Sequence, residues 1–294
     1  MNQKRSVAIQ RLFAAMSGAI FLGGFTGMGV AQEPNVAWTE GPDTVKLGEN
    51  IAELALSADH IFAGGDDTRK LMEMMGNSVS GQEVGIVSPK AENQDWFMIF
   101  EYAPEGYVKD DDKDAIDKDA ILKSYQEGTE EANKTRKEKG ISGLHVVGWY
   151  EEPHYDERTH NLVWAILAKD DGGGQVVNYN VRLLGREGYM SATLVDDPSR
   201  LATSKGEIDR IISAFSYKQG KRYAEWLPGD KVAKYGLAAL VAGGAGAAAV
   251  KLGFFAAFLK FAAKAWKLLV VAALAIVAAI KKGISALRGR GAEA

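Results

Sequence analysis

The 294-residue chain contains no cysteine. This absence excludes disulfide bonds, thiolate nucleophiles and metal sites built on cysteine. A domain without disulfides depends on its hydrophobic core for stability, and the span from Pro34 to Trp226 is long enough to bury one. We therefore expect one folded domain here, or at most two.

The chain also lacks a strong excess of charge of either sign, with a formal net charge of −3. Acidic residues concentrate in the middle of the sequence and basic residues near its carboxyl end. Nucleic-acid binding needs a basic face on the folded part. We therefore expect no nucleic-acid partner.

Motifs that mark common enzymes are absent as well. The sequence has neither a Gly-x-Ser-x-Gly elbow nor a His-Glu-x-x-His pair. Its glycine clusters at 64–65 and 172–174 lack the spacing of nucleotide-binding loops. We therefore expect no cofactor, and a non-catalytic binding or interaction module is favoured over an enzyme.

What is present at the amino terminus indicates export. Basic residues at Lys4, Arg5 and Arg11 precede an apolar stretch over 12–30, and small residues follow at 29–31. This order is typical of a secretory signal peptide. We expect residues 1–31 to be one, cleaved before Gln32; an uncleaved anchor or a buried helix is the alternative.

The carboxyl end is rich in Ala, Gly, Leu and Val over residues 235–280. About 20 apolar helical residues cross a bilayer. We therefore expect a transmembrane anchor within 229–260, and lipid contact through 235–280; packing of the tail in a protein core is the alternative. Residues 261–294 then form an apolar and basic helical tail, on the membrane surface or as a second membrane segment. The positive-inside rule assigns the basic carboxyl terminus to the cytoplasm and the main domain, residues 32–228, to the outside.

The sequence between these ends predicts an α+β fold. Alternation between residues 176 and 184 places Val177, Tyr179 and Val181 on one face of a strand and polar residues on the other. The segment 196–215 has the apolar spacing of a helix that covers a sheet. The expected fold class is an antiparallel sheet covered by helices, plus a C-terminal transmembrane or amphipathic helical tail.

Polar residues on and after that strand are the predicted binding set for a ligand or partner. They are Asn178, Asn180, Arg182, Arg186 and Glu187. The first three share the face expected to contact solvent, which is a common location for partner contacts. An exposed strand face that only keeps the domain soluble is the alternative.

Metal binding has two weaker candidate segments. His154, Asp156 and His160 lie in a predicted hairpin loop and have side chains that bind zinc, but without a helical motif. The acidic run from Asp110 to Asp119 has alternating carboxylates, yet the glycine and glutamate of a calcium loop are missing. Neither segment predicts a metal site by itself.

Several short patterns resemble one bacterial family. They include Gly148-Trp149, Val177-Asn178-Tyr179-Asn180, Leu184-Gly185-Arg186-Glu187-Gly188 and the start of the apolar tail at Lys234-Tyr235-Gly236. The resemblance is to the domain-of-unknown-function 2167 family of predicted membrane-anchored proteins, over about residues 35–285. It implies a bacterial envelope protein anchored in the inner membrane, and it brings no catalytic residues. The closing helix, with Ile211 to Phe215, also resembles Mog1/PsbP-like α+β domains.

Two function classes follow from these expectations. The first is a tethered envelope module that binds a protein, lipid or cell-wall partner. The second is a periplasmic hydrolase, metal-dependent or of another kind, that uses the loop of His154 and His160. The biochemical activity, the partner and the oligomeric state are not predicted.

Overall fold

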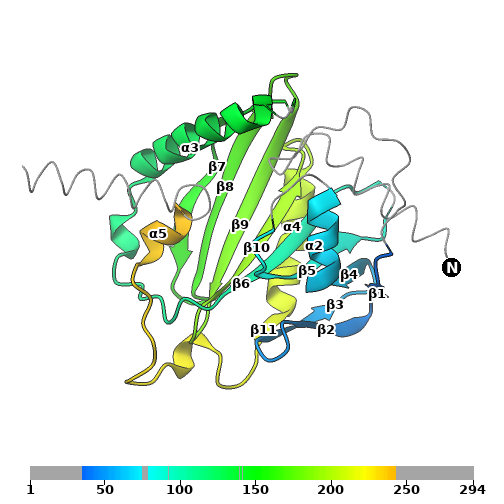
Figure 1. Cartoon of the computed structure of the whole chain (residues 1–294). Helices are drawn as coiled ribbons and strands as arrows, with labels where there is room; N and C mark the ends of the chain where they lie inside the picture. Colours follow the sequence, from blue (N-terminus) through cyan, green and yellow to red (C-terminus); the bar gives the residue numbers. More distant parts are fainter. Residues whose placement is uncertain (1–34, 75–78, 92, 139, 141, 243–294) are drawn as a thin grey trace, which may run out of the picture. The chain divides into compact units, whose positions relative to one another are not determined.

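The computed structural model describes residues 35–242, apart from residues 75–78, 92, 139 and 141. Antiparallel strands dominate its regular structure (Figure 1). The strands are β1 (Trp38–Glu40), β2 (Asp43–Leu47), β3 (Ala52–Leu56), β4 (His60–Gly64), β5 (Glu83–Pro89), β6 (Phe97–Ala103), β7 (Leu144–Asp156), β8 (Asn161–Asp170), β9 (Gln175–Leu184), β10 (Tyr189–Asp196) and β11 (Phe215–Tyr217). The helices are α2 (Gly65–Met74), α3 (Lys118–Glu138), α4 (Leu201–Ala214) and α5 (Leu237–Val241), with short 3₁₀ turns η2 (Lys113–Ala115) and η3 (Tyr223–Glu225).

The strands form two sheets. The larger has eight strands in the order β1-β4-β5-β6-β10-β9-β8-β7, and the smaller has the order β11-β3-β2. Strands β7 to β10 form a meander, and β10 closes against β6 with Val195 opposite Phe97. Because β4 follows β3 directly, the turn at residues 57–60 connects the two sheets.

One face of the large sheet packs against the small sheet and α4. The residues that alternate along β9, namely Val177, Tyr179, Val181 and Leu183, all belong to this core. Leu54 of the small sheet and Ile208 of α4 are buried in the same cluster. The predicted apolar face of β9 is therefore confirmed, and so is a closing helix over it.

The opposite face of the large sheet is also covered. Helix α2 contributes Leu71 and Met72 to a second core with Ile86 and Phe97, and α3 packs along β7 (Figure 1). Asn180 lies on this face and is only 9% exposed. The prediction that the polar face of β9 contacts solvent is wrong, because helices from elsewhere in the chain cover it.

The predicted fold class needs correction. The described residues form mainly two antiparallel sheets with few helices, so one face of the large sheet packs against a second sheet as well as α4, and no helical membrane tail is among the described elements. None of the helices within the described residues combines the length and hydropathy needed to cross a bilayer. The predicted tail falls mostly on residues 243–294, which lie outside the described part of the chain.

The few described residues of the predicted membrane segment pack on the domain. Leu237, Leu240 and Val241 of α5 are buried, with exposures of 0%, 2% and 0%. The Tyr125 hydroxyl of α3 donates to the Val241 carbonyl at 2.5 Å. The Leu237 N–H donates to the Asp112 carboxylate at 3.0 Å. The apolar character of α5 therefore serves the protein interior.

Candidate functional site

The candidate site is a groove along helix α4. Three adjoining hollows of about 220, 350 and 260 Å³ lie there, and Glu207 lines all three. Their walls come from residues 54–60, 90–91, 93–96 and 196–214. We call these adjoining hollows the α4 groove. Segments far apart in the sequence meet in it because the 57–60 turn joins the two sheets beside α4.

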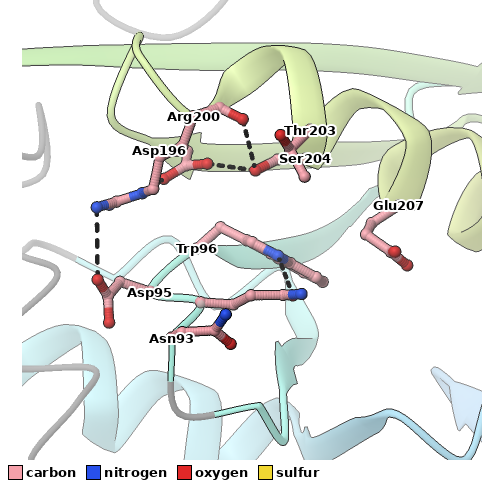
Figure 2. A pocket seen from close by; sticks show the side chains of 9 residues that line it. Asn93, Asp95, Trp96, Asp196, Arg200, Thr203, Ser204 and Glu207 are labelled. Carbon is pink, nitrogen blue, oxygen red and sulfur yellow. Dashed lines mark hydrogen bonds and ion pairs between the residues drawn. The ribbon is translucent and has the colours of Figure 1, made fainter.

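The first hollow is built on a buried carboxylate (Figure 2). Asp196, at the end of β10, is 5% exposed and accepts hydrogen bonds from the Ser204 hydroxyl and from Arg200 Nε, the latter at 3.1 Å. Arg200 also reaches Asp95, with 3.5 Å between Nη1 and the carboxylate. A buried carboxylate is stable only when its oxygens are bonded in this way. These bonds fix the first turns of α4 to the sheet.

Trp96 lines the first hollow. Its side chain is 2% exposed, and its indole N–H donates to Gln94 Oε1 at 3.1 Å (Figure 2). The ring meets His60 edge to face, with 5.4 Å between the centroids. Trp96 and His60 therefore form a buried aromatic pair beside the groove.

His60 lies at the centre of the groove and is 4% exposed. Its Nδ1 is 2.8 Å from the Ser57 hydroxyl, and its Nε2 is 3.7 Å from Glu207 Oε2. Burial lowers the pKa of His60, so the imidazole is neutral at pH 7. A carboxylate facing Nε2 favours the tautomer with its proton there. Nδ1 then accepts the hydrogen of the exposed Ser57 hydroxyl.

The third hollow is apolar on one side. Leu54, Leu56 and Ile211 line it, together with Ser57 and Arg210. Arg210 forms an ion pair with Glu207 one turn earlier on α4. The groove thus runs from an apolar end, past His60 and Glu207, to a charged end at Arg200.

The predicted binding set on β9 has a different position. Asn180 donates to the Asn178 carbonyl at 3.0 Å and accepts from the Thr193 hydroxyl at 3.2 Å. The Arg182 guanidinium lies 4.7 Å from the Trp164 ring centroid, and burial lowers its pKa. These three residues share the face that α2 and α3 cover.

Arg186 and Glu187 lie apart from them, in the turn between β9 and β10. Arg186 binds the Asp230 carboxylate through Nε and Nη2, at 2.7 and 2.9 Å. Glu187 accepts from Lys221 at 2.5 Å. Both side chains therefore attach the segment after β11 to the sheet.

The predicted metal candidates do not converge. His154 is exposed, with Nε2 3.7 Å from Glu151, and Asp156 accepts bonds from Arg158 and Thr159 in its own turn. His160 Nδ1 is 2.9 Å from the Tyr155 hydroxyl. Within the described residues, no group of three or more His, Asp or Glu side chains has the geometry of a metal site.

The acidic run after residue 110 has structural roles. Asp110 accepts from the Tyr155 hydroxyl at 2.9 Å, and Asp117 accepts from the Ala120 N–H at 3.0 Å. The second contact lies at the start of α3, where a carboxylate stabilises the free N–H groups.

Sequence reasoning missed the α4 groove because its residues come from three distant segments. His60 and Glu207 are 147 positions apart, a separation that no local motif spans. One local signal was present: Arg200, Ser204, Glu207 and Arg210 follow helical spacing and mark a polar side of α4. That side alone does not reveal which segment faces it.

The fold and groove define a two-sheet, mainly antiparallel domain with a polar groove beside its closing helix. A family model described as "Protein of unknown function (DUF2167)" matches residues 39–275, so the chain belongs to this family. No curated protein matches the chain.

A solved structure offers a distant comparison. It is the solution structure of cyanobacterial PsbP from Synechocystis sp. PCC 6803, which is 12% identical and covers 67% of this chain and 99% of its own. The TM-score of 0.36 is too low to support an argument about fold or function.

Proposed function

We propose that the chain is a binding module of the bacterial envelope, and that it binds an extended polar peptide segment of a partner protein in the α4 groove. The observation that carries this proposal is the set of three adjoining hollows that meet at Glu207. An extended segment suits three hollows in a row better than a compact ligand does.

The chemistry of the groove supports a peptide with mixed side chains. Arg200 and Asp95 offer both signs of charge at one end, and their side chains are 42% and 32% exposed. Leu54, Leu56 and Ile211 provide an apolar position at the other end. Polar rims around an apolar anchor are typical of protein interfaces.

The rigidity of the walls supports the same proposal. Asp196, Ser204 and Trp96 are buried and hydrogen-bonded, so the groove exists before a partner arrives. Preformed walls lower the entropy cost of association.

A test begins with a photo-reactive residue in place of Thr203, whose side chain is exposed beside the groove. The same residue at Lys134, on the exposed side of α3, is the control. The partner crosslinked in cells is purified, and its affinity for the unlabelled protein is measured. Arg200→Ala should weaken binding about tenfold or more, as loss of a charged contact at an interface does. Lys134→Ala should not; an unchanged affinity for Arg200→Ala would contradict the proposal.

The proposal includes an envelope location with the domain outside the cytoplasm and lipid contact by residues beyond Ala242. Support comes from the export pattern of residues 1–31 and from the Ala, Gly, Leu and Val content of residues 243–280. Lysines and arginines after residue 280 favour a cytoplasmic carboxyl terminus.

Fractionation tests this location. The full chain should sediment with membranes and resist extraction with carbonate, and a chain ending at Ala242 should stay in the supernatant. Equal amounts of both chains in the supernatant would contradict lipid contact. Protease added outside the inner membrane should digest the domain if it lies there.

A further inference from the structure

We propose that Ser57, His60 and Glu207 form a serine-nucleophile site at the apolar end of the α4 groove, and that it cleaves carboxylic esters with a short apolar acyl group. The three side chains are in series: Ser57 Oγ is 2.8 Å from His60 Nδ1, and His60 Nε2 is 3.7 Å from Glu207 Oε2. This order of a nucleophile, a base and a carboxylate that orients the base is typical of nucleophilic catalysis.

The protonation states of Ser57, His60 and Glu207 suit this chemistry. With the His60 proton on Nε2, Nδ1 is an acceptor and the Ser57 hydroxyl donates to it, while the Ser57 oxygen accepts from the Asp59 N–H at 3.3 Å. His60 is buried and neutral, hence able to accept that hydrogen. Glu207 lies where the imidazolium formed in the reaction needs a negative charge. The roles of the two ring nitrogens are exchanged relative to the Ser–His–Asp arrangement of serine proteases, and each still has a partner.

The surroundings define the substrate class. Ser57 is exposed to the third hollow, of about 260 Å³, so an acyl carbon has access to Oγ. Leu54, Leu56 and Ile211 provide an apolar wall for the acyl chain. Arg210, which forms an ion pair with Glu207, lines the same hollow. A hollow of this size admits a short chain only.

The reaction balances with water alone. Ser57 Oγ forms a bond to the acyl carbon while its proton moves to His60 Nδ1. The ester C–O bond then breaks, the leaving alkoxide takes that proton, and an alcohol departs. Water gives a proton to Nδ1 and attacks the acyl-Ser57 carbon. The carboxylic acid leaves, and Ser57 regains its proton.

A fluorophosphonate probe tests this on the full chain. Ser57 Oγ displaces fluoride from phosphorus, so mass spectrometry of peptides locates the adduct. Wild type should carry it on Ser57, and Ser57→Ala should not. His60→Gln should label about 100-fold more slowly, the effect of losing a general base. Ser199→Ala is the matched control, because that serine is exposed and bonds to Asp197 within its own turn; it should label like wild type.

Further measurements distinguish a loss of reactivity from a loss of folding. Each variant is compared with wild type by circular dichroism and thermal melting, and Glu207→Gln replaces His60→Gln if the latter melts early. Hydrolysis of p-nitrophenyl acetate should fall with labelling in the same variants. An absent adduct on Ser57, or equal labelling rates in wild type and a folded His60→Gln or Glu207→Gln variant, would overturn the proposal. The two proposals fail separately, because adduct formation on Ser57 is measured without the partner and the affinity of Arg200→Ala is measured without an ester.

Discussion

At the scale of single residues, Tyr217 connects two neighbouring strands, β9 and β10. Its buried hydroxyl donates to the Leu183 carbonyl at 2.7 Å and accepts from the Met190 N–H at 2.8 Å. Tyr217→Phe leaves both groups without a partner, so the free energy of unfolding should fall by about 1–3 kcal/mol. Urea unfolding measures this change. Tyr150→Phe is the control, because Tyr150 is 44% exposed, and it should change stability by less than about 0.5 kcal/mol.

His145 should make stability depend on pH. Its ring lies between Asp171 and Glu130, at 2.9 and 2.7 Å, and hydrogen bonds to these carboxylates raise its pKa above 6.5. The stabilisation that accompanies a raised pKa is complete at pH values below the pKa of the unfolded chain. It is lost as the pH rises through the pKa of the folded protein. His145→Ala should therefore lower the melting temperature at about pH 5.5 and have a smaller effect at about pH 8.5. An equal effect at both values would contradict the assignment.

His60 should make stability depend on pH in the opposite direction. Burial lowers its pKa, so the unfolded chain binds the proton more readily than the folded one. Its contribution to stability is present above pH 6.5, and it is lost as the pH falls through the lower pKa that His60 has in the folded protein. Acid should therefore loosen the α4 groove while it strengthens the His145 contacts. The fluorescence of Trp96, whose ring meets His60, reports on the first change.

At the scale of elements, a substitution in α5 tests where the apolar segment after residue 235 packs. Leu240 is 2% exposed against the domain. Leu240→Ala should lower the free energy of unfolding by about 2–5 kcal/mol, since a buried leucine loses its contacts and leaves a cavity. Denaturant unfolding of the chain in detergent provides the measurement. Leu227→Ala, at a residue 55% exposed, should have little effect. Equal small effects of both changes would show that α5 does not pack on the domain.

The strands of the meander could be predicted from the sequence because their pattern is regular. Along β9, alternate residues enter one core, which is the period that a covered strand face imposes. Strand β4 cannot be predicted in this way, because its first four residues are all buried and show no alternation. A strand covered on both faces has this pattern, and a short buried helix shares it.

At the scale of the whole molecule, pattern alone could not show which surfaces are covered. Asn178, Asn180 and Arg182 have the spacing of a solvent-facing row, and only the position of α2 and α3 in space shows that they are covered. The same limit applies to the candidate site, because His60 and Glu207 meet only after both sheets have formed. The apolar run after residue 235 was assigned to lipid on composition, and its first residues proved to be part of the core.

Hydrogen–deuterium exchange of the full-length protein with and without its purified partner is the most direct test of the α4 groove. The account predicts that protection on binding is confined to residues 57–60, 90–96 and the exposed turns of α4, with α3 and β7 unchanged. Protection over α3 and β7 with none at α4 would contradict it.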